Sequence, residues 1–179
     1  MKKKNKSQAV RKVALFGMLT ALALILSYVE ALIPAFFAFP GMKLGLTNIV
    51  VLVALYRMGS VPALTINLLR IVLVSVLFGS FASFVYSLAG GMLSTAVMIL
   101  LRHSGRLRLV TVSIAGGVAH NVGQIVAAMI MMSTAGIGWY LCVLWFTGLI
   151  TGALIGMLGG MLVKRLPERL FAGGKSGEE

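Results

Sequence analysis

The sequence predicts an all-α integral membrane protein, a six-helix bundle with both ends of the chain in the cytoplasm. Of the 179 residues, 59% are hydrophobic and only 11% are charged. The mean hydropathy of +1.01 lies outside the range of soluble globular domains. Apolar runs fill nearly all of residues 13–163, and short clusters of basic residues separate these runs.

The apolar region divides into six segments at Pro, Gly and charged residues. A spanning helix needs about 20 apolar residues, and the predicted spans are 13–33, 44–58, 61–78, 81–101, 109–133 and 139–163. The second span is the shortest, and only Gly59 and Ser60 separate it from the third. Residues 1–12 are then a cytoplasmic basic tail, and residues 164–179 are a cytoplasmic C-terminal tail.

The distribution of basic residues predicts the orientation. When the connections are assigned alternately to the two sides, 14 of the 16 Lys and Arg residues lie on one side. The positive-inside rule places that side in the cytoplasm of a multi-pass cell-membrane protein. This topology accounts for the net charge of +12, so we do not expect nucleic-acid binding. Lys43, in an opposite connection, and Arg70, in the third span, are the two exceptions.

Arg70 is a candidate ligand-binding residue because a charged side chain inside the bilayer is costly and usually faces a bundle interior or a water-filled cavity. Asn67 lies one helical turn before it. A second polar patch in the fifth span consists of His120, Asn121 and Gln124. Either patch can serve ligand binding or form hydrogen-bonded staples between helices, and the sequence leaves both interpretations open.

The outer connection between the first two spans supplies two further candidates. It is rich in Phe and Pro, and it brings Lys43 and Asn48 to the external mouth. Its aromatic residues serve equally well as a lid over a site or as an interfacial belt. Tyr86 in the fourth span completes the set of residues that we expect to contact a small-molecule substrate.

Small residues at helical spacing predict close helix contacts. A repeat of every four residues in the sixth span indicates a packing face; its members are Gly148, Gly152, Gly156 and Gly160. This face fits packing within the bundle or contact with another subunit. The first span carries a smaller patch of the same kind, formed by Ala14, Gly17 and Ala21.

Catalytic and metal-binding patterns are missing from the sequence. Cys142 is the only cysteine, and His103 is predicted to lie in a cytoplasmic loop, far from His120. Paired carboxylates and a Gly-rich Walker loop are absent as well. We therefore predict a protein that is not an enzyme and that binds no metal and no cofactor.

Three segments carry a family resemblance: "PGMKLGLTNIV" after the first span, "GSFASFVYSLAGGMLS" opening the fourth and "GGVAHNVGQ" in the fifth. They resemble the Gx transporter family, also labelled heptaprenyl diphosphate synthase component I. That family is similar to the substrate-binding S components of energy-coupling factor (ECF) importers, which are six-helix membrane proteins. The resemblance extends over nearly the whole chain.

This resemblance implies that the protein captures a vitamin-like or anionic nutrient for an ATP-driven importer. Its partners would be one transmembrane T subunit and two ATPase subunits. S components present small residues of the first helix to the T subunit, which assigns docking to Ala14, Gly17 and Ala21. A solitary secondary transporter is an alternative.

The synthase label suggests another alternative, a non-catalytic membrane partner of a heptaprenyl diphosphate synthase. Prenyl chain elongation uses aspartate-rich motifs that hold magnesium, and this chain contains no aspartate. It therefore lacks the residues of a catalytic subunit that works by that mechanism.

Overall fold

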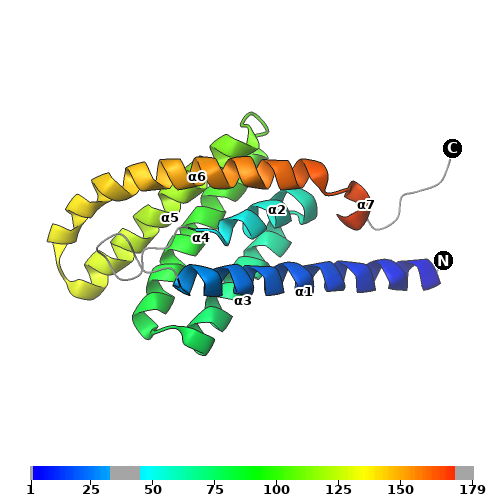
Figure 1. Cartoon of the computed structure of the whole chain (residues 1–179), viewed down its shortest axis with the longest axis horizontal. Helices are drawn as coiled ribbons and strands as arrows, with labels where there is room; N and C mark the ends of the chain where they lie inside the picture. The colour runs from blue at the N-terminus through cyan, green and yellow to red at the C-terminus, as the bar shows by residue number, and fades with distance from the viewer. Residues whose placement is uncertain (1, 33–44, 172–179) are drawn as a thin grey trace.

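The computed structural model describes residues 2–32 and 45–171, and within these ranges every regular element is a helix. Six long or medium helices and a short seventh follow in chain order, and Figure 1 shows how the helices pack against one another. The elements are α1 (Lys2–Leu32), α2 (Asn48–Met58), α3 (Ser60–Phe78), α4 (Phe81–His103), α5 (Leu109–Met132), the 3-10 turn η1 (Ala135–Trp139), α6 (Tyr140–Arg165) and α7 (Glu168–Phe171). The predicted helical membrane bundle is confirmed.

Five of these helices are long and apolar enough to cross a membrane, and α2 is the exception. Its 11 residues extend over about 17 Å at about 1.5 Å per residue, against an apolar bilayer thickness of about 30 Å. Seven of its residues are buried, from Asn48 to Leu55 with Ile49 excepted. The run is apolar on all sides because α2 is surrounded by other helices rather than by lipid.

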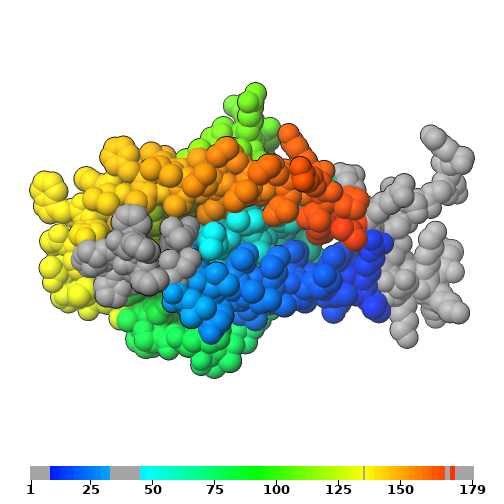
Figure 2. All heavy atoms as spheres, viewed as in Figure 1, coloured from blue at the N-terminus to red at the C-terminus, as the bar shows by residue number. Residues whose placement is uncertain are grey.

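Helix α2 lies at the centre of the hydrophobic core. Val51, Leu52 and Leu55 are completely buried, together with Ala63 and Ile66 of α3. Figure 2 shows α2 filling the space between α1 and α6. A Cβ placed on Gly159 of α6 would lie 2.7 Å from Leu52 Cδ2, so α6 approaches α2 closely at a position without a side chain.

The α5–α6 contact depends on glycine. A Cβ placed on Gly117 would lie 2.7 Å from the Gly148 carbonyl oxygen, and one on Gly152 would lie 2.7 Å from Ile114 Cα. Gly156 likewise lies against α5, at Val110 and Ser113. At Gly160 an added Cβ would meet only ordinary contact, 3.6 Å from Leu109 Cδ2. Of the stripe predicted in the sixth span, the first three members are thus the ones in close backbone contact with α5.

The basic ends of four helices gather at one end of the bundle. Arg57, at the end of α2, donates hydrogen bonds to the carbonyl oxygens of Val163 and Leu166 at the end of α6. Arg102, at the end of α4, lies 5.3 Å from the ring centroid of Tyr56 in α2. The start of α5 reaches the same place through Leu109 and Gly160. The alternating assignment of the connections places these helix ends on the same side of the membrane, and in the structure they lie close together. We call this end of the bundle the basic end.

Helix α1 begins inside the predicted basic tail, at Lys2, and continues without a break to Leu32. Its outer portion packs on α3, where the rings of Tyr28 and Phe78 meet edge to face with centroids 5.4 Å apart. Ala14, Gly17 and Ala21 are exposed on its surface.

Candidate ligand-binding site

The site is built around Arg70, which lies on the buried face of α3. Apolar and small residues recur along that face at helical spacing, so the face packs inward and carries the arginine with it; its members are Ala63, Ile66, Asn67, Arg70, Ile71 and Val74. Only 4% of Arg70 is exposed. The charge that the sequence places inside a span therefore lies in the interior of the bundle, not on its lipid-facing surface.

Asn67 holds Arg70 in place. The side-chain oxygen of Asn67 accepts a 2.6 Å hydrogen bond from Arg70 Nη2. Its amide nitrogen donates to the Gly91 carbonyl oxygen at 3.0 Å and to Thr95 Oγ1 at 2.8 Å. The Thr95 hydroxyl in turn donates to the Gly91 carbonyl oxygen at 2.8 Å. Since both amide hydrogens of Asn67 are used within the protein, Asn67 positions Arg70 and has no donor left for a ligand.

Within the described part of the chain, Arg70 keeps donors without an acceptor. A guanidinium carries five N–H donors, and the described residues supply one hydrogen bond to it, from Asn67. Its Nε is buried and has no hydrogen-bond acceptor among the described residues. A buried donor without an acceptor is costly, so this end of the guanidinium is a natural contact for an oxygen of a bound molecule.

Glu30 supplies a negative charge to the same site. It lies near the end of α1, is 6% exposed, and interacts electrostatically with Arg70. Its carboxylate accepts a hydrogen bond from the backbone N–H of Gly45, a glycine with φ of +78° that leads into α2. The sequence shows Glu30 only as an acid near the outer end of a span, and the packing of α1 on α3 brings its charge to Arg70.

His120 and Gln124 of α5 form a second polar face, against α4 at the residue next to the one that Asn67 and Arg70 approach. A Cβ placed on Gly90 would lie 2.8 Å from Gln124 Cγ and 3.3 Å from His120 Cε1. One placed on the next residue, Gly91, would lie 3.2 Å from Asn67 Nδ2 and 3.7 Å from Arg70 Nη2. Two consecutive glycines thus let polar groups of α3 and of α5 both approach the α4 backbone.

The Asn121 side chain points toward α6 and not toward α4. Its amide nitrogen donates to the Leu144 carbonyl oxygen at 2.8 Å, and Thr147 Oγ1 lies 3.5 Å away. Asn121 therefore joins α5 to α6 and does not share the α4-facing surface of His120 and Gln124. In the polar patch predicted for the fifth span, His120 and Gln124 therefore face α4, whereas Asn121 forms a hydrogen bond to α6.

Asn48 and Tyr86 lie toward the end of the bundle away from the basic end. Asn48 opens α2, is 8% exposed, and its amide nitrogen would lie 3.2 Å from a Cβ on Gly45, so it neighbours the glycine that binds Glu30. Tyr86 is partly buried on α4, one turn before Gly90. Lys43 lies outside the described residues.

The sequence carries no signal for the role of Thr95, which orients Asn67, or for the position of Glu30. A threonine in an apolar helix is too common to be a signal, and the proximity of Glu30 depends on helix packing. Among the described residues, no group of three or more His, Cys, Asp and Glu side chains lies close enough to hold a metal ion.

The comparison with protein families gives a match over residues 19–162 to the model of heptaprenyl diphosphate synthase component I. The chain belongs to this family. No curated protein and no solved structure matched the chain.

The part of the chain that matches the component I family runs from within α1 almost to the end of α6. It contains the whole polar site, including Glu30, Arg70 and His120. Ala14 and Gly17 precede the matched residues, and Ala21 lies inside them. The family assignment thus covers the candidate ligand site fully and the α1 surface patch in part.

Proposed function

We propose that this component I family protein is the substrate-binding component of an ECF-type, ATP-driven importer for a small nutrient. In this proposal the chain binds the nutrient within the membrane and is not itself an enzyme. A T subunit and two ATPase subunits supply the ATP-driven step. The polar site among α1, α3, α4 and α5 would hold the nutrient.

The proposal rests on the burial and the hydrogen bonding of the Arg70 side chain. Its guanidinium is almost fully buried, is oriented by Asn67, and keeps a buried Nε without an acceptor in the described part of the chain. A charge inside a membrane costs about 2.5 kcal/mol or more, which favours a functional role for this group. A ligand that brings an acceptor oxygen to Arg70 offsets this cost.

The surrounding groups indicate which ligand chemistry fits. Arg70 favours a carboxylate, phosphate or carbonyl oxygen, and His120 and Gln124 add polar side chains where α5 packs against Gly90 of α4. Glu30 already balances part of the charge of Arg70, so the site suits a carbonyl-rich molecule as well as an anion. The expected ligand is a small vitamin-like or anionic nutrient.

Removal of the charge at the site tests the binding proposal. Native mass spectrometry of gently extracted protein detects a small molecule that co-purifies with it. We expect Arg70→Gln and His120→Ala to lose this molecule, whereas Arg106→Gln, which removes an exposed arginine at the basic end, retains it. Melting temperatures establish that the variants are folded. If folded Arg70→Gln and His120→Ala retain the molecule as the native protein does, the site assignment is wrong.

A second candidate function follows from the family description, a non-catalytic membrane partner of a heptaprenyl diphosphate synthase. Affinity purification of the tagged protein separates the two. Recovery of a T subunit and ATPases supports the importer, and recovery of a prenyl synthase whose product chain length changes with this protein supports the second candidate. Nutrient uptake without any ATPase would instead indicate a solitary secondary transporter.

A further inference from the structure

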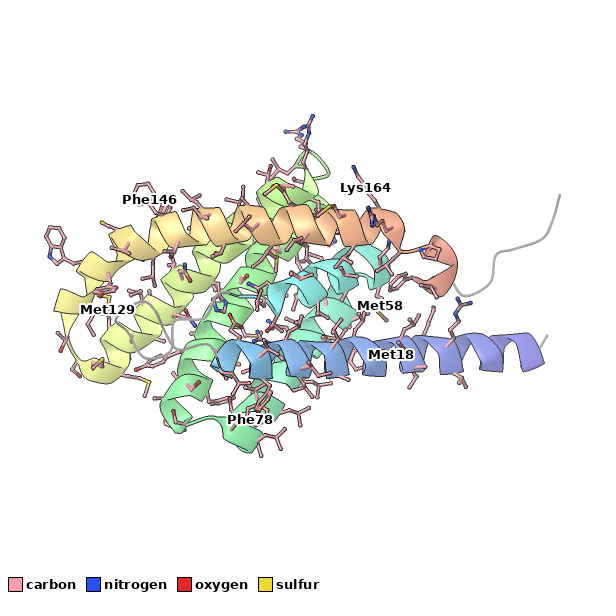
Figure 3. The ribbon with its side chains drawn as sticks, viewed as in Figure 1. Met18, Met58, Phe78, Met129, Phe146 and Lys164 are labelled. Carbon is pink, nitrogen blue, oxygen red and sulfur yellow. The ribbon has the colours of Figure 1, made fainter. Side chains whose placement is uncertain are left out.

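The basic end carries a patch formed by two segments far apart in the sequence. Arg106 and Arg108 are exposed in the connection between α4 and α5, and Lys164 is exposed in the last turn of α6. Leu109 follows Arg108 directly and contacts the position of Gly160, one helical turn before Lys164. Figure 3 shows Lys164 pointing outward on the side of α6 where the α4–α5 connection lies.

Two other basic side chains at this end, Arg57 and Arg102, have protein contacts. Arg57 binds carbonyl oxygens at the end of α6, and Arg102 lies over the Tyr56 ring. Both are at least partly buried, in contrast to Arg106, Arg108 and Lys164. Arg106, Arg108 and Lys164, together with Arg165 next to Lys164, are exposed and present positive charge outward.

An apolar stripe leads away from this patch along the bilayer-facing surface of α6. Leu154, Met157 and Met161 are about half exposed, and their spacing of three and four residues continues to Lys164 on one side of the helix. Leu107, in the α4–α5 connection, is 40% exposed beside the arginines. Positive charge at the end of a spanning helix, directly above an exposed apolar stripe, matches the layout of a phospholipid.

We propose that Arg108 and Lys164, with Arg106 beside them, bind the headgroup of an anionic phospholipid whose acyl chain lies along Met157 and Met161. Juxtamembrane Lys and Arg attract anionic lipids, and Arg and Lys both bind phosphate oxygens. The stripe favours a lipid over a soluble phosphate compound, because it offers apolar surface that only an acyl chain covers. This lipid site is separate from the nutrient site around Arg70.

Matched charge variants test the lipid site. The protein is reconstituted in nanodiscs of phosphatidylcholine with a minor fraction of phosphatidylglycerol, released into detergent and examined by native mass spectrometry. We expect the native protein to retain phosphatidylglycerol selectively. Arg108→Gln/Lys164→Gln should retain on the order of tenfold less relative to phosphatidylcholine. Arg11→Gln/Lys12→Gln, which removes two exposed charges from α1, should retain it as the native protein does.

Two further arms distinguish the alternatives. Met157→Ser/Met161→Ser should weaken phosphatidylglycerol retention with all basic residues intact, and dissolved glycerol phosphate should not displace the lipid. Equal loss in the two charge variants would show unspecific attraction and overturn the proposal. So would unchanged retention in Arg108→Gln/Lys164→Gln, or displacement by glycerol phosphate. Circular dichroism confirms that each variant keeps its helices.

Discussion

Arg70 Nη2 and the side-chain oxygen of Asn67 are 2.6 Å apart, one turn from each other on α3. Asn67 is fixed in turn by two hydrogen bonds to α4. The direction of the buried guanidinium is therefore set by the junction of two helices and not by α3 alone. A change in how α3 and α4 pack would redirect Arg70, which connects the geometry of the bundle to the chemistry of the site.

Thr95→Val should weaken this junction, because valine keeps the shape of threonine but removes the oxygen that accepts from Asn67. We expect a loss of about 1 kcal/mol in stability, measured as a lower melting temperature in detergent, together with weaker retention of the co-purified nutrient. Thr65→Val is the matched control, since Thr65 is exposed and its hydroxyl donates to the Val61 carbonyl oxygen of its own helix. Equal effects of the two substitutions would contradict the role given to Thr95.

Gly152→Ala should destabilise the bundle. The new Cβ would lie 2.7 Å from the backbone Cα of Ile114, so α5 and α6 must move apart and lose packing contacts. An overpacked core typically loses about 1–3 kcal/mol, and thermal unfolding measures the loss. Gly160→Ala places its Cβ at an ordinary distance and improves helix propensity, so its melting temperature should stay level or rise. A similar decrease in both variants would contradict the close α5–α6 approach.

Asn121→Leu should separate stability from binding. It removes the hydrogen bond to the Leu144 carbonyl oxygen, so the melting temperature should fall by the equivalent of about 1 kcal/mol. Because the Asn121 side chain faces α6, the folded fraction should retain the co-purified nutrient, as native mass spectrometry would show. Loss of the nutrient from folded Asn121→Leu would place this residue in the binding site after all.

Gly17→Leu and Ala21→Leu should impair assembly with a T subunit if the importer proposal holds. A Cβ on Gly17 meets no described atom within 4 Å, and both residues are exposed, so leucine is accommodated without damage to the bundle. Recovery of T subunit and ATPases with tagged protein should fall severalfold or more. Ala96→Leu, an exposed site on α4, should leave recovery unchanged, and equal recovery with all three variants would exclude this docking face.

The number and approximate bounds of the helices follow from the sequence because long apolar runs have few other stable states in a membrane. The isolation of Arg70 was visible for the same reason: one charge stands out in an apolar run. The sequence showed that the second span is the shortest, but hydropathy could not show that α2 is enclosed by other helices, since a helix buried in protein and one facing lipid have similar composition. Nor could it assign adjacent residues to different neighbours, as happens where His120 faces α4 and Asn121 faces α6.

The enclosed helix α2 has a consequence for the order in which the protein is made. Arg57 binds carbonyl oxygens 106 and 109 residues further along the chain, and Leu52 packs on Gly159. During synthesis, which proceeds from the N-terminus, α2 therefore enters the bilayer well before α6 exists to cover it. Until then the helices made first are packed incompletely. The native packing around α2 forms only after the last span has been translated.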